Sequence, residues 1–318
     1  MKKFYTLITV LLLIIMLTVP TISMKNEKTI KSVNASPKTS QSSDEDKVIV
    51  LQKDENKCIK ISITEYLTGV LAGEISPEYE EEAIKAQIVA AYSLMLYRSD
   101  EYANEEYDIT DDYTTDQNYL TYAERKEKWN ENFETNEKKI SLLIADVYKQ
   151  HITYNGKNAL CVYHAVSGGR TESAENIWGG EYPYLVPVES VADMLASDFV
   201  STVTYTTEEF KSLCKSSEIA LDGEYESYFS EIETTDSGTV KTMKICNTEY
   251  SGQEIRSAFG LRSANFDISF DDGMFVFTVR GYGHGVGMSQ YGANEMAKEG
   301  ADYKEILLWY YSNCEITG

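Results

Sequence analysis

The sequence predicts an α+β fold, with helices packed against mixed or antiparallel sheet and a core domain that carries a smaller inserted subdomain. Apolar and alanine residues recur every three or four positions between residues 77 and 98, which is the period of a helix with one buried face. Residues 59–63 alternate between apolar and polar, which is the period of a half-buried strand. Helical and strand patterns are interspersed without an internal repeat, and this mixture favours the α+β class.

The same reasoning places the other elements. An apolar run at residues 48–51 predicts the start of the folded part, and Thr64 is expected to cap a short helix. Ser76 followed by Pro77 indicates the start of a long helix. The remaining expected elements are helices at 77–98, 121–149, 207–215, 290–299 and 303–311, a hairpin at 152–162 that turns at Asn155-Gly156, and strands at 241–245 and 274–280.

Residues 1–24 are predicted to be an N-terminal membrane anchor or signal segment. Lys2 and Lys3 precede 21 uncharged residues, from Phe4 to Met24, and a helix of that length can cross a bilayer. The positive charges favour a single-pass orientation in the cell membrane, with the rest of the chain on the extracytoplasmic side. We favour an uncleaved anchor over a cleaved signal peptide, and both place the domain outside the cytoplasm. Residues 25–47 are polar and predict a flexible linker, so the domain spans residues 48–318.

The composition excludes some partners. With 51 acidic and 29 basic residues the net charge is −22, which disfavours nucleic-acid binding. The 24 tyrosines suit stacking on sugar rings as well as core packing. The five cysteines are odd in number and scattered, so most are expected to be free thiols, with one disulfide left open. Cys161 and His164 have the spacing of half a zinc site, but no second half is evident, so no metal and no cofactor are predicted.

Glu74 is the candidate catalytic residue. It lies in the segment Gly73-Glu74-Ile75-Ser76-Pro77, in the turn expected just ahead of the alanine-rich helix. Glycoside cleavage needs a proton delivered to the leaving oxygen, and a partly buried Glu can deliver it if desolvation raises its pKa. The N-terminus of the following helix would favour the ionised form, so the two effects oppose each other. On spacing alone, a structural role at the helix end is the alternative.

Two glycine-containing segments are expected to line a cleft. In residues 163–180 two glycine pairs permit close approach, and Trp178 can stack on a sugar. In residues 281–293 a glycine at every second position leaves one face of an extended segment bare, while Tyr282 and His284 share the other face. The second segment lacks the context of a phosphate-binding loop, and the chain has no Gly-x-Ser-x-Gly or His-Glu-x-x-His motif. A carboxylate mechanism is therefore favoured.

Together, these segments resemble the SpoIID/LytB family. The shared pattern is a Tyr-Leu-x-Gly-Val start, a Glu followed by an apolar residue and Pro, a Lys-Ala-Gln-x-Val-Ala-Ala helix, a His with a Ser-Gly-Gly-x-Thr loop, and a Gly-His-Gly-Val-Gly-Met-Ser-Gln-x-Gly-Ala end. These parts fall at residues 66–70, 74–77, 85–91, 164–171 and 283–293, and residues 257–266 also look like a family segment. The resemblance covers nearly all of residues 48–318, and its last motif is long and specific.

The resemblance implies a lytic transglycosylase of peptidoglycan that acts in sporulation engulfment. Glu74 would protonate the oxygen between N-acetylmuramic acid and N-acetylglucosamine and then act as a base, so that the muramic 6-hydroxyl closes onto C1 as a 1,6-anhydro end. Members of this type prefer glycan strands stripped of stem peptides. They work with a partner amidase and a membrane scaffold, from the mother-cell membrane that faces the forespore.

The resemblance also implies substrate contacts along both glycine segments. Tyr92 stands where family helices commonly carry Arg, and Ala165 and Val166 stand where hydroxyl residues are usual. The residues expected to bind substrate are Tyr92, Tyr163, His164, Ser167, Gly168, Gly169, Thr171, Trp178, His284, Ser289 and Gln290.

Two other functions stay open from the sequence. The first is a non-catalytic glycan-binding module that enhances a partner amidase, which the departures at Tyr92 and Ala165 motivate. The second is ordinary glycan hydrolysis, which leaves reducing ends and needs a second carboxylate near Glu74. Glu172 is the candidate for that carboxylate, by proximity to the loop motif alone.

Overall fold

The computed structural model describes residues 47–318, all within one compact unit. The predicted anchor at residues 1–24 lies outside the described residues, and so does the linker except for Lys47, which is the first residue of a strand. Within residues 47–318, no helix is both long enough and apolar enough to cross a membrane.

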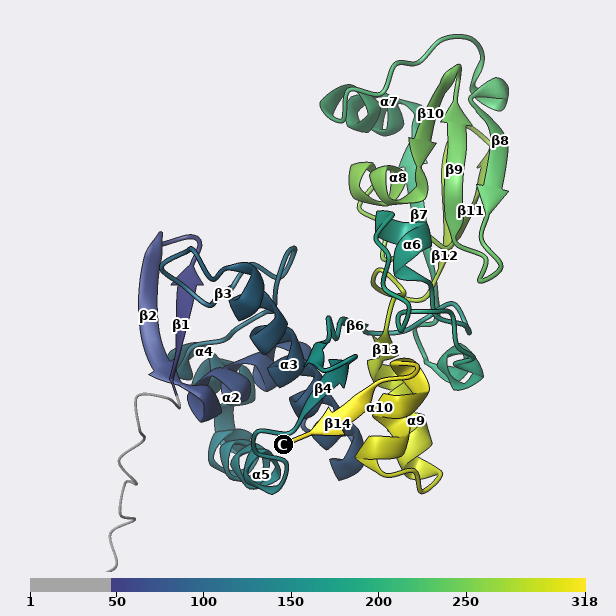
Figure 1. Ribbon diagram of the computed structural model, residues 1–318. Helices are drawn as coiled ribbons and strands as arrows, with labels where there is room; N and C mark the ends of the chain where they lie inside the picture. The colour runs from purple at the N-terminus through teal and green to yellow at the C-terminus, as the bar shows by residue number, and fades with distance from the viewer. Residues whose placement is uncertain (1–46) are drawn as a thin grey trace, which may run out of the picture. The chain divides into compact units, whose positions relative to one another are not determined.

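The helices and strands carry the labels of Figure 1. In chain order they are β1 (Lys47–Gln52), β2 (Lys57–Ser62), α2 (Ile63–Glu74), α3 (Glu81–Glu101), β3 (Ile109–Thr110), α4 (Tyr122–Trp129), η2 (Asn130–Asn132), α5 (Phe133–Asp146), β4 (His151–Tyr154), β5 (Lys157–Asn158), β6 (Tyr163–His164), α6 (Ala174–Trp178), η3 (Val191–Leu195), β7 (Val200–Thr206), α7 (Thr207–Ser216), η4 (Tyr225–Ser227), β8 (Phe229–Thr234), β9 (Val240–Ile245), β10 (Thr248–Ser251), α8 (Gly252–Ala258), β11 (Phe266–Asp271), β12 (Met274–Arg280), β13 (Met288–Ser289), α9 (Gln290–Lys298), α10 (Tyr303–Tyr310) and β14 (Glu315–Thr317).

The sheets of the described residues are small and of mixed or antiparallel type. Their strand orders are β2-β1-β3, β14-β4-β5, β13-β6, β11-β12-β7 and β10-β9-β8. Strand β1 pairs with β3 in parallel, and β13 pairs with β6 in parallel, whereas the other pairings are antiparallel. The α+β class predicted from the sequence is therefore confirmed.

Two hydrophobic clusters organise the described chain. The larger cluster draws on residues between Val48 and Leu185 and again between Val286 and Cys314. The smaller one is formed entirely between Phe210 and Val279, by strands of the two C-terminal three-stranded sheets and helices α7 and α8 (green in Figure 1). The chain thus leaves the first cluster, builds the second and returns, which is the inserted subdomain that the sequence predicts.

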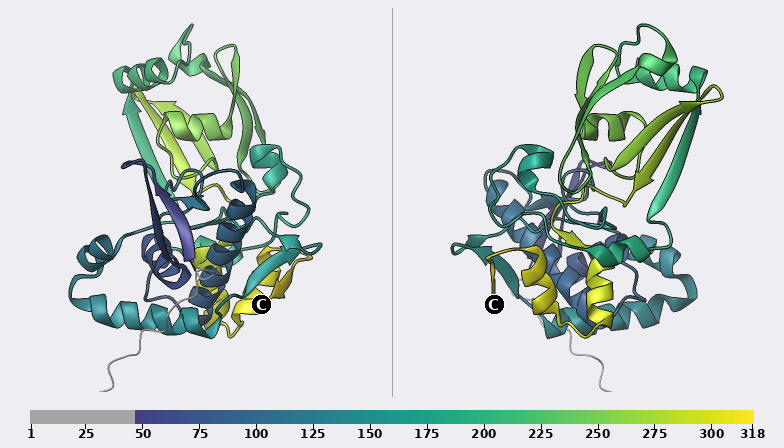
Figure 2. Two further views of the ribbon diagram at one scale, coloured as in Figure 1. Left: turned by 60° about the vertical axis from the view of Figure 1, so that its left-hand side comes forward. Right: turned by 90° about the vertical axis from the view of Figure 1, so that its right-hand side faces the viewer.

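Helix α3 is the centre of the larger cluster. The sequence pattern predicts one buried face, but nearly every residue from Ala83 to Met95 is buried. Helices α2, α5, α9 and α10 and strand β4 all pack against it, and Figure 2 shows the yellow helices α9 and α10 beside it. Small side chains such as Ala86 and Ala90 allow this close packing on all sides. A helix that is enclosed on every side shows only a weak amphipathic pattern, which explains the error.

Other expectations were wrong at element boundaries. Helix α3 begins at Glu81, because Ser76 to Glu80 form a turn in which the Ser76 carbonyl accepts from the Tyr79 amide at 3.2 Å. The cap of α2 is Ser62, whose Oγ accepts from the Glu65 amide at 3.1 Å, and not Thr64. The long helix expected at 121–149 is split into α4 and α5, because Asn130 has a positive φ of 45°. The expected hairpin is present only as β4 and β5.

A buried arginine joins three helices of this core. Arg125 of α4 is fully buried, donates from Nη1 and Nη2 to Glu65 of α2 at 3.0 and 3.1 Å, and donates from Nε to Glu137 of α5 at 2.7 Å. Its Nη1 also donates to the Leu120 carbonyl at 2.9 Å. The guanidinium therefore balances two carboxylates from neighbouring helices at one point.

We expect Arg125→Ala to lower the free energy of unfolding by about 3 kcal/mol, because it leaves both carboxylates without their counter-ion. Chemical denaturation of the full chain measures the change. The matched control is Arg280→Ala, which removes a guanidinium from a partly exposed pair with Asp267, and this loss should stay below about 1 kcal/mol. Equal effects of the two variants would contradict the role assigned to Arg125.

Candidate active site

Glu74 is the last residue of helix α2 and lies partly buried. This corrects the expectation of a turn next to the N-terminus of the following helix. The C-terminal end of a helix carries partial negative charge, so it opposes ionisation of Glu74 where the sequence suggested support for it. Burial raises the pKa of Glu74, and this effect outweighs the opposing ones of a hydrogen bond from the Asn118 amide and the positive charge of Lys128.

One hydrogen bond fixes the Glu74 carboxylate. The Asn118 amide donates to Oε1 at 2.9 Å, whereas Oε2 accepts no hydrogen bond from the described residues. Lys128 of α4 does not contact the carboxylate directly, because its Nζ donates to the Ala72 carbonyl at 2.7 Å. One oxygen of Glu74 is therefore held by the protein, and the other remains available to a ligand.

A cavity of about 420 Å³ opens at Glu74. It brings together the predicted residues Tyr163, His164, His284 and Gln290, which come from β6 and from the segment around β13. The sequence reasoning missed other lining residues, namely Tyr113, Asp116, Asn118, Arg256 and Tyr282, of which Tyr282 was noted only as a neighbour of His284. The lining side chains are thus drawn from α2, the loop after β3, β6, α8 and the glycine-rich segment.

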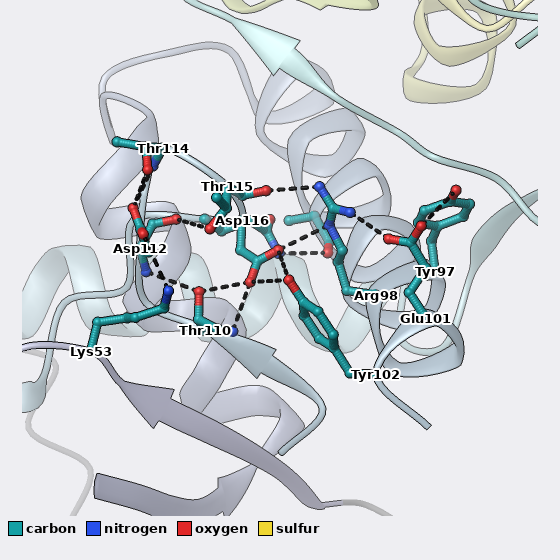
Figure 3. A network of polar contacts seen from close by, with 12 residues as sticks. Lys53, Tyr97, Arg98, Glu101, Tyr102, Thr110, Asp112, Thr114, Thr115 and Asp116 are labelled. Atoms are coloured by element: carbon teal, nitrogen blue, oxygen red, sulfur yellow. Dashed lines mark hydrogen bonds and ion pairs between the residues drawn. The ribbon is translucent and has the colours of Figure 1, made fainter. Parts of the chain in front are cut away.

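The loop that carries Asn118 is anchored by a buried carboxylate (Figure 3). The side chain of Asp116 is fully buried and pairs with Nε of Arg98 at 2.9 Å. Its Oδ2 accepts from both the amide and the hydroxyl of Thr110, at 2.9 and 2.7 Å. Because these partners lie on α3 and β3, the loop is fixed to both before it reaches Asn118. Asp116 is saturated with donors, so it serves as an anchor of the loop and not as a second free carboxylate.

Tyr113 projects from the same loop and is 77% exposed. Asp112 shapes the turn beside it, because its Oδ1 accepts from the amide and the hydroxyl of Thr114 at 2.9 and 2.5 Å (Figure 3). An exposed tyrosine at the cavity wall is suited to stack on a sugar ring. The surplus of tyrosines in the sequence was a signal for such residues, but it could not single out this one.

A hydrogen-bonded chain lies next to Glu74. The Tyr163 hydroxyl donates to Oε1 of Gln117 at 2.7 Å, and Nε2 of Gln117 donates to the Tyr66 hydroxyl at 2.7 Å and to the Ala91 carbonyl at 3.2 Å. Burial, followed by the charge of Glu74, raises the pKa of Tyr163. Tyr163 therefore stays protonated. The side chains of Tyr163, Gln117 and Tyr66 are all neutral, so this hydrogen-bonded chain gives Glu74 no counter-ion.

Two histidines of the cavity are held neutral. Burial lowers the pKa of His164 to about 4 and that of His284 to about 3. Nδ1 of His164 donates to the Val286 carbonyl at 3.1 Å, which leaves its buried Nε2 as an acceptor with no partner among the described residues. His284 is in the opposite tautomer, because Nδ1 accepts from the Val286 amide and Nε2 donates to the Tyr163 carbonyl. The pair therefore adds no charge to the cavity, and of its four ring nitrogens only Nε2 of His164 lacks a partner among the described residues.

The glycine-rich segment is not extended as expected. Gly281, Gly283, Gly285 and Gly287 all have positive φ, between 72° and 115°. A Cβ on Gly287 would overlap the Val162 carbonyl, and a Cβ on Gly283 would overlap the His164 side chain. Alternate left-handed residues let this segment lie directly against residues 162–166, where β13 pairs with β6. The glycines therefore place His284 beside His164, with ring centroids 5.7 Å apart.

Several predicted substrate-binding residues lie outside the cavity. Ser167 and Ser289 are buried and donate to the carboxylate of Asp193, from the amide at 2.7 Å and the hydroxyl at 2.9 Å respectively. Thr171 is buried and its Oγ1 accepts from the Val188 amide at 2.8 Å. These contacts join the loop after β6 to η3 and α9, so the residues position the loop and do not line the cavity at Glu74.

The remaining predicted residues also lie outside the lining. Gly168 lets Asn265 approach closely, and Gly169 has a φ of 99°. Tyr92 is buried on α3 and packs edge-on against His151, so it faces the core and not the cavity that contains Glu74. Trp178 is 46% exposed, and its ring centroid lies 5.1 Å from that of His284, which places it next to the cavity.

Within residues 47–318, the only other carboxylate in the lining of the Glu74 cavity is the saturated Asp116. Glu172 is buried, accepts from the Thr235 hydroxyl at 2.6 Å, and does not line the cavity. Cys161 is a buried free thiol with a raised pKa, chiefly because of desolvation. Within the described residues, no group of three or more His, Cys, Asp or Glu is arranged to hold a metal ion.

Gly73 permits the contact that holds Glu74, because a Cβ there would overlap the Asn118 carbonyl. We expect Gly73→Ala to push the Asn118 amide away from Glu74 and to reduce at least tenfold the glycan cleavage that we propose for this site, on the order of the effect of misplacing a reacting group. The measurement is turnover of purified glycan. Thr64→Ala on the same helix adds no atom near Asn118 and should retain activity, and a loss in both variants would argue against this specific contact.

Comparison with known proteins identifies the family. A family model described as Stage II sporulation protein matches residues 52–154. Across its whole length the chain is 34% identical, over 337 aligned residues, to stage II sporulation protein D of Bacillus subtilis (strain 168), and it covers 96% of that protein. It is also 31% identical over 273 residues to stage II sporulation protein D of Bacillus amyloliquefaciens, in an alignment that covers 85% of the chain and 78% of that protein. An amidase enhancer of Bacillus subtilis (strain 168) is 25% identical over 302 residues, with 79% of the chain and 40% of that protein covered. The chain therefore belongs to the SpoIID family of stage II sporulation proteins.

Proposed function

We propose that this protein is a lytic transglycosylase of peptidoglycan in which Glu74 is the acid and base. The observation that carries the proposal is the state of Glu74: it lies in a cavity, its pKa is raised, and only Oε1 is held by the protein. A carboxyl group that stays protonated above its ordinary pKa can donate to a glycosidic oxygen. Membership of the sporulation family supports a role in cell-wall remodelling.

The reaction needs no second carboxylate. Protonated Glu74 donates its proton to the oxygen that joins C1 of N-acetylmuramic acid to N-acetylglucosamine, and that C–O bond breaks. The muramic 6-hydroxyl then bonds to C1, and Glu74, now ionised, takes the hydroxyl proton. Glu74 ends as it began, the products are a free sugar hydroxyl and a 1,6-anhydro end, and no water is consumed. This matches a site where Asp116 is saturated and Glu172 lies elsewhere.

Neutral groups around Glu74 are suited to hold the sugar. The free Nε2 of His164 can accept from a hydroxyl or from an N-acetyl amide. Gln290 lines the same cavity, and Tyr113 and Trp178 offer aromatic faces at its edge. Neutral hydrogen bonds and stacking suit a glycan, because its hydroxyl and acetamido groups carry no charge.

The relatives support a proposal for the cellular setting. We propose that the chain acts in sporulation engulfment, anchored by residues 1–24 in the mother-cell membrane, with residues 25–46 as tether and residues 47–318 as the working domain. The similarity to an amidase enhancer supports a partner amidase, and a membrane scaffold would hold the two enzymes together. The glycan strands would then be stripped of stem peptides before Glu74 acts.

Replacing Glu74 by Gln is expected to lower the formation of 1,6-anhydro ends by at least about a thousandfold, because the amide cannot transfer a proton. Mass spectrometry of stripped glycan incubated with the full chain measures these ends. Glu78→Gln is the matched control, since Glu78 is an exposed glutamate four residues further along the chain and lies outside the cavity.

The products separate the proposal from its rivals. Reducing ends in place of anhydro ends would indicate hydrolysis. No cleavage by the wild-type chain, together with stimulation of an amidase by both wild-type and Glu74→Gln chains, would establish a non-catalytic enhancer. The similarity to the amidase enhancer is the observation that favours this second candidate.

The pH profile tests the protonation state of Glu74. Activity that needs protonated Glu74 should fall as pH rises through its raised pKa. Lys128 lowers that pKa through its charge, so Lys128→Met should move this basic limb to higher pH, by less than about one unit for a charge near the surface. Lys126→Met removes an exposed lysine of the same helix that has no such effect on Glu74. If the fall of activity at high pH occurs at the same pH in Lys128→Met as in the wild-type chain, Glu74 is not the group whose ionisation causes that fall.

A further inference from the structure

Arg256 of α8 is a desolvated cation without a counter-ion among the described residues. Its Nε donates to the Leu261 carbonyl at 3.4 Å and its Nη1 to the Gln253 side chain at 3.3 Å, so both partners are neutral. Desolvation lowers its pKa. The chain carries 51 acidic residues, and yet none within the described part pairs with this guanidinium. Arg256 is half-buried, and a partly desolvated charge without a counter-ion is costly, so this group is suited to a partner outside the protein.

Arg256 faces the Glu74 cavity and a second cavity beside it. The second has a volume of about 480 Å³ and is also lined by Arg262 and by Ser257 and Gly260. Arg256 and Tyr282 line both cavities, so the two cavities are neighbours that share one wall. The cation therefore lies on the surface along which a ligand extends away from Glu74.

Arg262 adds a second positive group at the far wall. Its guanidinium carbon lies 4.4 Å from the centre of the Tyr282 ring, and its Nη2 donates to Asp198 at 2.5 Å. Asp198 neutralises much of this charge, so Arg262 mainly fixes the ring of Tyr282. Arg256 is left as the group that can form a two-pronged bond to an anion.

We propose that Arg256 is an anion subsite that binds the free lactyl carboxylate of a muramic acid residue on a stripped glycan strand. The inference rests on the proposed function. A glycan strand offers neutral hydroxyl and acetamido groups, and the lactyl carboxylate is free only after the amide bond to the stem peptide has been hydrolysed. Guanidinium and carboxylate match in charge and in planar geometry, whereas the intact amide has neither the charge nor a second acceptor oxygen.

This assignment gives a structural basis for the preference for stripped strands that the family resemblance implies. A hydrolysis that releases the stem peptide and exposes the lactyl carboxylate must supply its substrate. The order is then set by recognition within this chain, because a strand that still carries peptides lacks the anion that Arg256 binds. The strongly acidic surface would oppose long-range attraction of such a strand, so the selection depends on the short-range bond.

Binding in a non-cleaving background tests the subsite. The full-length Glu74→Gln chain in detergent is titrated with stripped glycan strands and with the same strands whose lactyl carboxylates have been converted to methylamides. We expect about tenfold tighter binding of the carboxylate strands, in line with one charge-assisted hydrogen-bonded pair. The added substitution Arg256→Gln should abolish this preference, and Arg256→Lys should retain part of it.

Arg280→Gln is the matched control, because Arg280 pairs with Asp267 and lies outside both cavities. It should keep the full preference. Equal affinity of the Glu74→Gln chain for both strands would overturn the proposal without any Arg256 variant. A preference that survives in a folded Arg256→Gln chain, judged by its unfolding curve, would overturn it as well.

Assays with the same two kinds of glycan strand distinguish a failure of the anion-subsite proposal from a failure of the transglycosylase proposal. If the wild-type chain forms no anhydro ends but the binding preference depends on Arg256, the anion subsite stands and the transglycosylase fails. If the wild-type chain cleaves both strands to anhydro ends with equal kcat/KM, the chemistry stands and the subsite fails.

Discussion

The close approach of residues 117–120 to helix α2 is the contact on which the rest of the site depends. Gly69 and Gly73 lie one turn apart on α2, and neither leaves room for a Cβ against Tyr119 and Asn118. This gap lets the Asn118 amide reach Glu74 at 2.9 Å and encloses the carboxylate. Burial raises the pKa of Glu74, whereas the hydrogen bond from the Asn118 amide lowers it, so this segment orients the acid while burial favours its protonated form.

Around this contact, some charged side chains hold the fold together, whereas others keep hydrogen-bonding capacity for a ligand. Asp116, Asp193 and Glu172 are buried carboxylates that accept several hydrogen bonds or hold a neighbouring loop. Glu74 and Arg256 face the cavity with part of their bonding capacity unused. An acid and an unpaired cation in neighbouring cavities suit a ligand that has one oxygen to protonate and one anion to bind. The proposed chemistry and the proposed selectivity therefore come from one surface.

The sequence predicted the element types well where a segment has a strong local signal. Helices α7, α9 and α10 and strands β9 and β12 lie within a residue or two of their expected positions. The predicted ends of helices were wrong where a turn or an unusual backbone conformation, and not the apolar pattern, determines where the helix begins or ends. The start of α3 depends on the turn after Ser76, and the break after α4 depends on a left-handed Asn130. The sequence also did not predict that α3 is enclosed by other elements. A helix that is buried on all sides has no polar face, so its pattern does not show which side faces the core.

For the site, the sequence by itself determined the chemistry-bearing motifs: Glu74, the His164 loop, the His284 segment and the family to which they belong. Only the tertiary structure decided which of these meet. It turned Ser167, Ser289 and Tyr92 into core or loop contacts and brought in Asn118, Tyr113 and Arg256 from segments without a recognisable motif. It also reversed the helix effect on Glu74. The physical reason is that burial and hydrogen-bond partners depend on long-range packing, which residue spacing along one segment does not encode.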